Sequence, residues 1–234
     1  DRDKLEESCN KEVPVDELPH KFVRYIYWVH KSIAHKKQYA DEIAKGKGSA
    51  IIAHLAEGRR DDPYNQKEYE VVKLLGMNKK GVNFVHGVGI NEKGLEDMAA
   101  KQMGIIWSPF SNLLLYNQTL DVKLAMEKGV LLAMGSDWLP TGSKGPLEEL
   151  KVAREYLLKE GTAQAVTKIS GRSSLEEALY DMVTENPAKL INHWQDGADK
   201  SKWQNGESKG GVGTLTPKAK GSGVITTKMY SSDP

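Results

Sequence analysis

Four polar side chains stand at or just beyond the ends of short apolar runs. His54 ends the run SAIIAH, His86 ends VNFVH and Asp137 ends VLLAMGSD, while Glu57 follows His54 by three residues. Histidine nitrogen and carboxylate oxygen are suitable ligands for zinc or a related divalent metal. A catalytic site of this kind keeps one position open for a water molecule whose pKa the ion lowers. These residue types therefore point to metal-assisted hydrolysis.

Each group suits a different step of such chemistry. An aspartate at the end of a strand can bind the metal and also accept a proton from the water. Glu57 lies in the loop beyond its strand, where a carboxyl group can protonate a substrate nitrogen as a C–N bond breaks. A single histidine at the end of an apolar strand is more often a hydrogen-bonded core residue, and Asp137 could instead cap a turn. The coincidence of all four positions is what favours a catalytic site.

The elements that must position these groups alternate regularly. The apolar runs lack a two-residue alternation, which is typical of parallel strands buried on both faces. A glycine follows each predicted helix and can close it in the left-handed conformation. The sequence thus predicts a parallel α/β fold with strands at 49–54, 82–86, 104–108 and 130–135, and helices at 64–75, 92–103, 119–128 and 146–160. In a (β/α) barrel the carboxyl ends of such strands form the active face.

The two ends of the chain are less regular. Residues 18–45 have helical periodicity, although Tyr25, Tyr27 and Trp28 leave a strand at 22–29 open. Past the last strand, Ser173 with Glu176 predicts a capping box, and the Asn186-Pro187 pair predicts the start of a short helix. From residue 196 the chain is rich in Gly, Ser and Lys, so it is either a weakly packed strand pair or disordered. The expected organisation is a helical segment over 1–48, a catalytic unit over 49–195 and a tail over 196–234.

Composition narrows the function classes. The chain has 33 basic and 32 acidic side chains among 234 residues, which argues against a nucleic-acid or membrane surface built on bulk charge. Cys9 is the only cysteine, so no intrachain disulfide and no multi-thiolate metal site can form. No apolar stretch approaches the roughly 18 residues that a membrane span needs. We expect a cytoplasmic protein, and the lack of an initiating methionine is consistent with a fragment.

Five motifs occur in an order that resembles the metal-dependent amidohydrolase superfamily, in its chlorohydrolase, guanine deaminase and adenosylhomocysteine deaminase branch. They cover roughly residues 49–191 and are HLAEG (54–58), VHGVGI (85–90), WSPFSNLLL (107–115), GSDW (135–138) and TENPAKLI (184–191). Five blocks in one order are far more specific than any one of them. The resemblance implies a (β/α)₈ barrel of the TIM type. It also implies an enzyme that hydrolyses C–N bonds, other than peptide bonds, in a small heterocyclic or amide substrate.

The resemblance also implies a role for each rim residue. His54 corresponds to the metal-binding histidine of the fifth barrel strand, and Asp137 to the eighth-strand aspartate that is both metal ligand and base. Glu57 corresponds to the glutamate that contacts the substrate. His86 corresponds to the sixth-strand histidine that orients substrate or hydroxide, although related two-metal branches use it as a ligand. The implied cofactor is a divalent metal, zinc or alternatively iron.

One departure from the family pattern changes the expected architecture. The family draws two further ligands from a His-x-His motif on the first barrel strand, and this chain contains none. The sequence therefore predicts only the second half of the barrel, strands five to eight, with helical extensions. An alternative is a non-catalytic half-barrel that works only with a partner half. Exposed sheet edges would then favour association with that half or with a second copy.

The remaining signals have structural explanations. Ser111 and Asn112 suit a loop that leads into a helix, and we favour a structural role for both. Trp107 and Trp138 flank the predicted rim and either line a pocket or pack on neighbouring loops. The pair Gly87 and Gly89 lacks the third glycine of a dinucleotide-binding loop, so that kind of site is rejected.

Overall fold

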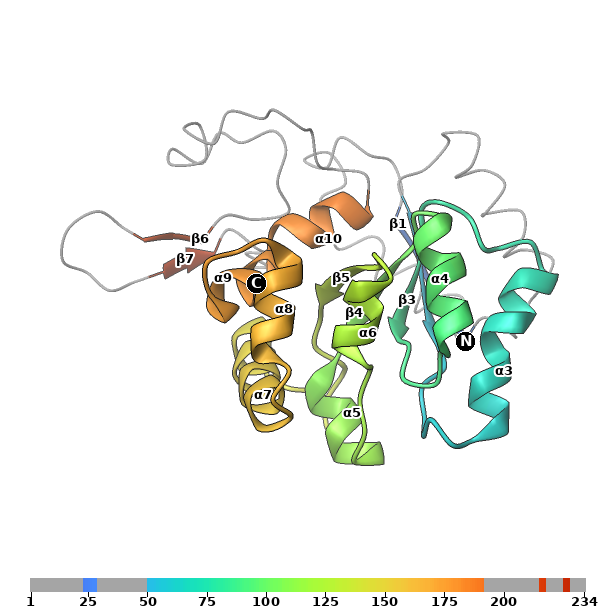
Figure 1. Cartoon of the computed structure of the whole chain (residues 1–234), viewed down its shortest axis with the longest axis horizontal. Coiled ribbons are helices and arrows are strands. Elements are labelled where there is room, and N and C mark those ends of the chain that lie inside the picture. The colour runs from blue at the N-terminus through green and yellow to red at the C-terminus, as the bar shows by residue number, and fades with distance from the viewer. Residues whose placement is uncertain (1–22, 29–49, 192–214, 218–224, 228–234) are drawn as a thin grey trace, which may run out of the picture.

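The computed structural model describes residues 23–28, 50–191, 215–217 and 225–227 (Figure 1). Its centre is a five-stranded parallel sheet in which the strands follow one another in chain order. The strands are β1 (Val23–Trp28), β2 (Ala50–Leu55), β3 (Val82–His86), β4 (Gly104–Trp107) and β5 (Leu131–Met134). Each crossover between β2 and β5 contains at least one helix, as parallel neighbours require.

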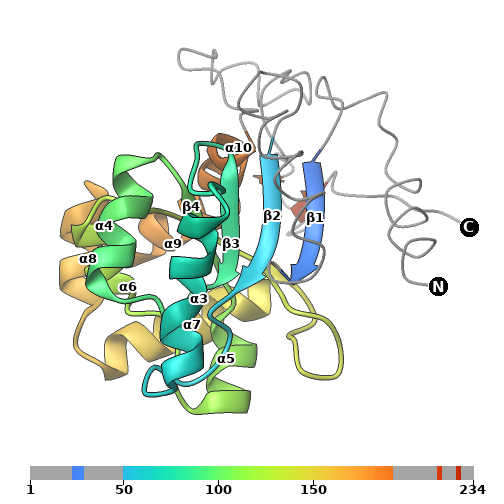
Figure 2. The ribbon, with the colours of Figure 1, turned by 90° about the vertical axis from the view of Figure 1, so that its right-hand side faces the viewer.

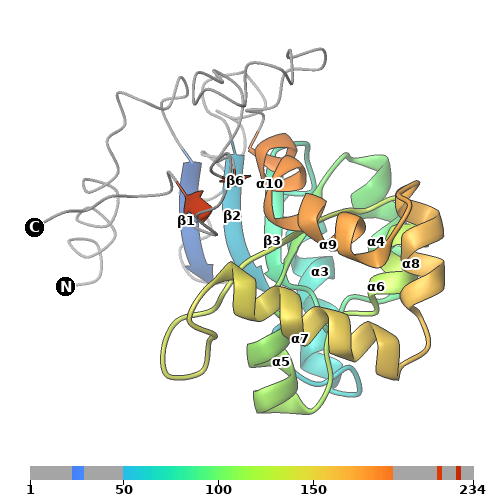
Figure 3. The same cartoon turned by 90° about the vertical axis from the view of Figure 1, so that its left-hand side faces the viewer.

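The helices gather on one side of this sheet, as Figures 2 and 3 show from two directions. In Figure 2 the arrowheads of β1 and β2 point toward the end where α5 lies, whereas α10 lies at the opposite end. The helices are α3 (Pro63–Leu74), α4 (Glu92–Ala100), α5 (Pro109–Tyr116), α6 (Val122–Glu127), α7 (Pro146–Lys159), α8 (Ala163–Ser170), α9 (Leu175–Val183) and α10 (Glu185–Leu190).

The hydrophobic core lies between the sheet and these helices. Alternate strand residues supply it, and the parallel register pairs Phe84 with Ile105 and Ile105 with Leu132. These side chains are 0–2% exposed. Trp107, at the end of β4, is fully buried and meets Tyr156 of α7 edge to face. The strands are therefore fixed in register by the face that holds the apolar side chains.

A second set of contacts closes the amino end of the sheet. The side-chain amide of Asn83 donates to the Leu190 carbonyl at 3.0 Å and accepts from the Gly104 amide at 2.9 Å. Asn186 of α10 donates to the Leu132 carbonyl at 2.8 Å. The short helix α10 is thereby tied to β3 and β5, which leaves the carboxyl ends of the strands as the end that carries the rim.

The alternating part of the sequence prediction is confirmed. The four predicted strands are β2 to β5, the four predicted helices are α3, α4, α6 and α7, and Asn186-Pro187 lies in the first turn of α10. The capping box is displaced by one residue, because the side chain of Ser174, not Ser173, accepts from the amide of Glu177. The pair β6 (Leu215–Pro217) and β7 (Ile225–Thr227) is antiparallel, which bears out the strand-pair alternative for these residues of the tail.

Other expectations need correction. Residues 23–28 form β1, which bears out the strand alternative and not the helix, and the rest of the predicted 18–45 helix lies outside the described residues. The parallel sheet consequently has five strands instead of four. Residues 109–116, which were expected to be a loop, form α5, where Pro109 occupies the first turn. The helix α8 was not predicted, because eight residues give too few turns for a helical pattern of apolar residues to stand out in the sequence.

Within the described residues, no helix is both long enough and apolar enough to span a bilayer.

Candidate metal centre

Two histidines and a glutamate meet at the carboxyl ends of β2 and β3. His54 is the fifth residue of β2, His86 is the last residue of β3, and Glu57 lies in the loop after β2. One ligand atom from each of the three lies within 4.8 Å of the other two. The Nε2 atom of His86 is 3.5 Å from the Glu57 carboxylate, and the two imidazole rings are 5.0 Å apart. The structure thus brings together three of the four predicted residues.

The backbone around this cluster adopts uncommon conformations. His86 has a φ of 73° and Ala56 a φ of 51°, which place both in the left-handed region. Non-glycine residues seldom adopt it, and such positions cluster at functional sites. The Ala56 amide donates to the Glu68 carboxylate at 2.6 Å, and the Ala56 carbonyl accepts from Gly89 at 3.1 Å. The first bond ties the loop after β2 to α3, and the second holds the two rim loops against each other.

Burial keeps both histidines neutral. The ring of His86 is fully buried, and this burial, together with the nearby His54, lowers the pKa of His86 to about 3. Burial also lowers the pKa of His54, which is 6% exposed, while the negative charge of Asp137 opposes that shift. A neutral imidazole has a lone pair for a metal ion or an acceptor, so burial prepares these rings for ligand contact.

The pKa of Glu57 is shifted upward, opposite to the pKa values of the two histidines. Burial and the charge of Asp137 raise the pKa of Glu57 to about 7, although a hydrogen bond from the Tyr116 hydroxyl at 3.3 Å works against the rise. A carboxyl group that titrates near neutral pH can both donate and accept a proton under ordinary conditions. This environment fits a proton-transfer residue better than a simple surface glutamate.

Asp137 lies beside the cluster without entering it. The residue is half-buried in the loop after β5, and its own carboxylate accepts from the Trp138 amide at 2.8 Å. Its charge acts on His54, Glu57 and Glu149, so the carboxylate is near all three. It is not a member of the three-residue group whose ligand atoms converge. Its backbone carbonyl would lie only 2.0 Å from a Cβ added at Gly142, which shows how tightly this loop folds back.

Two residues of α5 contact the cluster and were missed as site residues. Asn112 lies 2.8 Å from Nδ1 of His86, and Tyr116 reaches Glu57. Positions four residues apart share one face of a helix, so both side chains turn toward the rim. The spacing was visible in the sequence, but the segment was expected to be a loop, in which that periodicity has no meaning. Asn112 was predicted to be structural, and its contact with His86 gives it a place in the site as well.

Glu149 of α7 supports the same helix from outside the cluster. Its carboxylate is fully buried and accepts from the Phe110 amide at 3.0 Å, at the start of α5, which has no side-chain cap of its own. Burial raises the pKa of Glu149.

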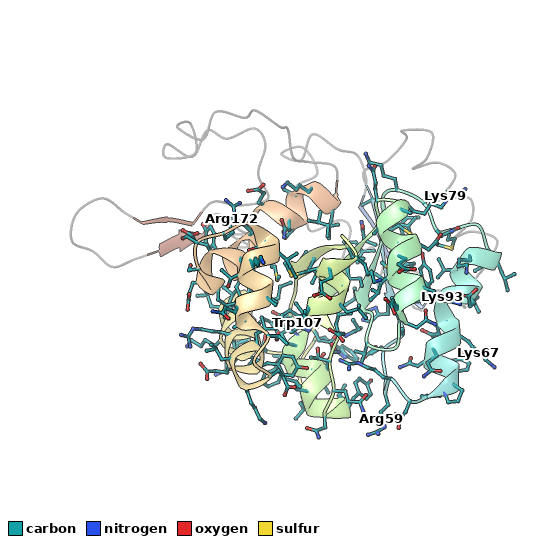
Figure 4. All side chains as sticks on the ribbon, viewed as in Figure 1. Arg59, Lys67, Lys79, Lys93, Trp107 and Arg172 are labelled. Carbon is teal, nitrogen blue, oxygen red and sulfur yellow. The ribbon has the colours of Figure 1, made fainter. Side chains whose placement is uncertain are left out.

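The two tryptophans near the predicted rim lie in different surroundings. Trp107 lies in the interior, whereas Arg59 and Lys67 lie at the edge of the molecule (Figure 4). Trp138 is 70% exposed, so it packs into no interior pocket.

The donor set fits a divalent ion of the zinc type. It combines neutral imidazole nitrogen with carboxylate oxygen, which both zinc and iron accept. The Nε2 atom of His86 is buried and has no hydrogen-bond partner within the described part of the chain. A buried polar atom without a partner is rare in folded proteins and calls for a ligand or water at that position.

Known proteins that are similar to this chain include deaminases. No protein-family profile matches the chain. A 5-methylthioadenosine/S-adenosylhomocysteine deaminase of Thermococcus sibiricus is 26% identical over 165 residues, which cover 66% of this chain and 35% of the relative. The corresponding enzyme of Bacillus cytotoxicus is 25% identical over 67% of the chain and 36% of the relative. The chain therefore spans about a third of the length of these curated relatives.

Solved structures share the fold. E. coli guanine deaminase superposes with a TM-score of 0.57 at 22% identity, over 74% of this chain and 40% of that structure. The atrazine chlorohydrolase of Arthrobacter aurescens TC1, solved with zinc, gives 0.55 at 13% identity, over 81% and 43%. The resemblance to the amidohydrolase superfamily, in its chlorohydrolase, guanine deaminase and adenosylhomocysteine deaminase branch, is confirmed by these comparisons.

Proposed function

We propose that this chain, as a relative of the amidohydrolase superfamily, carries the carboxyl-terminal part of the active site of a metal-dependent hydrolase. The bonds hydrolysed would be C–N bonds, other than peptide bonds, in a small heterocyclic or amide substrate. The observation that carries the proposal is the convergence of His54, Glu57 and His86 within 4.8 Å at the carboxyl ends of neighbouring parallel strands. The curated relatives, which are deaminases, support the same reaction class.

Two residues of this chain would hold the ion. His54 offers a neutral imidazole, and Asp137 offers a carboxylate from the loop after β5. The ion, when bound, supplies a water that is activated for attack. Zinc fits this donor set, and iron is the alternative. The chain contains no His-x-His pair, so the remaining protein ligands would come from residues outside these rim strands.

The proton transfers would fall to the carboxylates. Asp137 would accept a proton as the nucleophile forms. Glu57, whose pKa lies at about 7, would pass a proton to the substrate nitrogen so that it leaves as a neutral amine. His86 would contact the substrate or the attacking oxygen through the Nε2 atom that has no partner within the described residues. His86 is fully buried and the two carboxylates are partly buried, which strengthens these electrostatic contacts.

The alternative, a non-catalytic half-barrel, is not favoured by the relatives, whose names describe enzymes. Its architectural part stays a prediction. In the described sheet, β1 and β5 are the edge strands, each paired on one side only. Open edges favour pairing with another chain. Association with a missing barrel half or with a second copy would be measured by sedimentation of the full chain.

Metal analysis tests the proposal. The full chain would be stripped with a chelator, loaded with zinc, dialysed and analysed for zinc per chain. We expect the wild-type chain to retain zinc, and His54→Ala and Asp137→Asn to lose affinity by at least about tenfold. Asp61→Asn is the matched control, because this carboxylate is 68% exposed and pairs with Arg59. Equal zinc content in the wild-type and His54→Ala chains would overturn the ligand assignment.

Hydrolysis itself requires a second measurement. Release of ammonia would be followed for the zinc-loaded chain on amino-substituted purines and triazines, with and without Glu57→Gln. Loss of activity in Glu57→Gln, with its zinc content unchanged, would support the proton-transfer role. Equal rates in the two chains would contradict it.

A further inference from the structure

A buried chain of hydrogen bonds lies behind His86. The indole nitrogen of Trp107 is 2.6 Å from the hydroxyl of Thr119, and that hydroxyl is 3.2 Å from Oδ1 of Asn112. The amide nitrogen of Asn112 is 2.8 Å from Nδ1 of His86. All four side chains belong to residues that are 0% exposed.

The direction of this chain follows from what each group can do. An indole N–H only donates, so the Thr119 oxygen accepts from Trp107. The Thr119 hydroxyl then has one proton, which it donates to Oδ1 of Asn112. With its oxygen used as an acceptor, Asn112 presents its NH₂ group to His86. The Nδ1 atom of His86 is therefore the acceptor, and the proton of the neutral ring lies on Nε2.

The reverse direction leaves a donor without an acceptor. If the Asn112 amide were turned over, its NH₂ group would face Thr119 and its oxygen would accept from Nδ1 of His86. The proton of the Thr119 hydroxyl would then have no acceptor, since within the described residues its side chain bonds only to Trp107 and Asn112. The reverse direction therefore leaves two buried polar atoms without a hydrogen-bond partner within the described residues, the Thr119 hydroxyl and Nε2 of His86, whereas the first direction leaves only Nε2. Each such group costs free energy, so the first direction is favoured.

The opposite side of the ring favours the same tautomer. Nε2 of His86 faces the Glu57 carboxylate at 3.5 Å. When Glu57 is ionised, its carboxylate attracts a proton on Nε2 and repels a lone pair there. In that ionisation state the contacts on both sides of the imidazole favour the same tautomer.

We propose that Asn112, Thr119 and Trp107 are positioning residues that hold His86 in its Nε2–H tautomer, so that His86 donates a hydrogen bond into the site and does not ligate the metal. The substrate consequence rests on the proposed function: the group facing His86 would be an acceptor, such as a carbonyl oxygen, a ring nitrogen lone pair or the attacking oxygen. The tautomer itself depends only on this chain.

Nitrogen NMR of the metal-free chain tests the tautomer directly. In a chain labelled with ¹⁵N-histidine and treated with a chelator, long-range ¹H–¹⁵N correlations distinguish the two tautomers of each ring. The signals of His86 are identified by their absence in His86→Asn. We expect the Nε2–H pattern for His86 in the wild-type chain. An Nδ1–H pattern would overturn the proposal, and this measurement requires no variant of the positioning residues.

Asn112→Asp reverses the bond at the same position. A carboxylate can only accept, so Nδ1 of His86 should become protonated, and the lone pair should move to Nε2. Thr119→Val removes the donor that orients the Asn112 amide, and a mixture of tautomers is expected. Asn117→Asp, five residues further along on an exposed position, is the charge-matched control and should leave the spectrum unchanged. A wild-type pattern in Asn112→Asp would contradict the role of Asn112.

Cobalt(II) titration separates this inference from the proposed function. If Nε2 of His86 becomes a lone pair in Asn112→Asp, cobalt affinity should rise on the order of tenfold over the wild-type chain, with a change in the visible absorption of the ion. Equal affinity in the two chains, where both bind cobalt, would contradict the claim that the tautomer keeps His86 from ligating. If neither chain binds cobalt, the proposed metal function fails, while the NMR result still decides the tautomer.

Discussion

The strand β3 carries two buried polar side chains that differ in every other respect. Asn83, near its amino end, is 1% exposed, and its amide both donates to Leu190 and accepts from Gly104. His86, at its carboxyl end, is 0% exposed and has a left-handed backbone. Its Nε2 atom has no hydrogen-bond partner within the described residues. Three residues apart, both polar atoms of the Asn83 side chain are hydrogen-bonded, whereas only one of the two ring nitrogens of His86 is.

This difference distinguishes a structural end of the sheet from a functional one. Buried polar groups are normally hydrogen-bonded, and the exceptions gather where a ligand or water completes the set. Backbone strain at the same position supports that explanation, because strained residues cluster at binding and catalytic sites. We therefore interpret the amino end of the sheet as the structural end and the carboxyl end as the one that the proposed function uses, as in parallel α/β folds generally.

The largest expected effect on stability comes from removing the structural member. Asn83→Leu deletes both hydrogen bonds, so the Gly104 amide and the Leu190 carbonyl each lose this buried partner. We expect the free energy of unfolding to fall by about 2–4 kcal/mol, since each such group costs about 1–3 kcal/mol. Urea unfolding of the zinc-free chain measures the change.

His86→Asn is the matched variant on the same strand. It removes Nε2, which has no partner within the described residues, and one hydrogen bond, between Nδ1 and Asn112, whereas Asn83→Leu removes two. Asparagine also tolerates the left-handed backbone better than most residues. The loss of stability should therefore be smaller than for Asn83→Leu. An equal or larger loss in His86→Asn would remove the distinction between the two ends of β3.

The sequence predicted the sheet well because one signal dominated there. Apolar runs of four to six residues that are buried on both faces have few alternatives, and β2 to β5 lie where they were expected. Where the prediction was wrong, the sequence carried two conflicting signals for secondary structure. Around Tyr25 and Trp28, aromatic residues favoured a strand while the longer spacing favoured a helix, and backbone pairing with β2 decided for the strand. Such pairing is not visible in a local pattern.

The site was predictable in its members but not in its geometry. His54, Glu57 and His86 could be selected because strand ends in a parallel sheet meet at one edge, and the structure brings them together. The offset of Asp137 depends on how its loop folds back at Gly142, which is a matter of tertiary packing. The support from Asn112 required knowing that residues 109–116 are helical.

Substitution of Gly104 or Gly142 by alanine should give the next largest effects, on stability and on zinc affinity respectively. At the amino end, a Cβ added at Gly104 would lie 2.1 Å from the Leu190 side chain and 2.8 Å from the Leu131 carbonyl. Gly104→Ala should lower the free energy of unfolding by about 1–3 kcal/mol, as overpacking of a buried position does. Zinc affinity should not change, because the site lies at the other end of the strands. Urea unfolding and zinc titration measure the two quantities.

Gly142→Ala should show the reverse pattern. The added Cβ would meet the backbone of Asp137 at 2.0 Å, so the loop must shift and carry the carboxylate with it. We expect a stability change below that of Gly104→Ala and a loss of zinc affinity on the order of tenfold. If both variants affected stability and zinc affinity in the same proportion, the two ends of the sheet would not be separable in function.

The smallest expected change in the free energy of unfolding concerns Asp97, whose carboxylate contrasts with that of Glu57. Burial raises the pKa of Glu57, whereas for Asp97 burial is outweighed by hydrogen bonds from Asn78 at 2.9 Å and Tyr69 at 2.8 Å, which lower its pKa. Asp97 lies on α4, away from the rim, and its carboxylate accepts both of these hydrogen bonds. Asp97→Asn should therefore destabilise the chain at neutral pH, by no more than about 1 kcal/mol because solvent screens this group.

The pH dependence of that difference has a definite sign. A carboxylate with a lowered pKa binds fewer protons in the folded chain than in the unfolded chain, so its contribution is complete above the unfolded pKa and is lost as the pH falls through the folded pKa. The difference in unfolding free energy between the wild-type and Asp97→Asn chains should accordingly shrink in acid. Glu70→Gln, on an exposed ion pair with Lys73, is the control. A difference that grew as the pH fell would mean that Asp97 is held like Glu57, in a site that disfavours its charge.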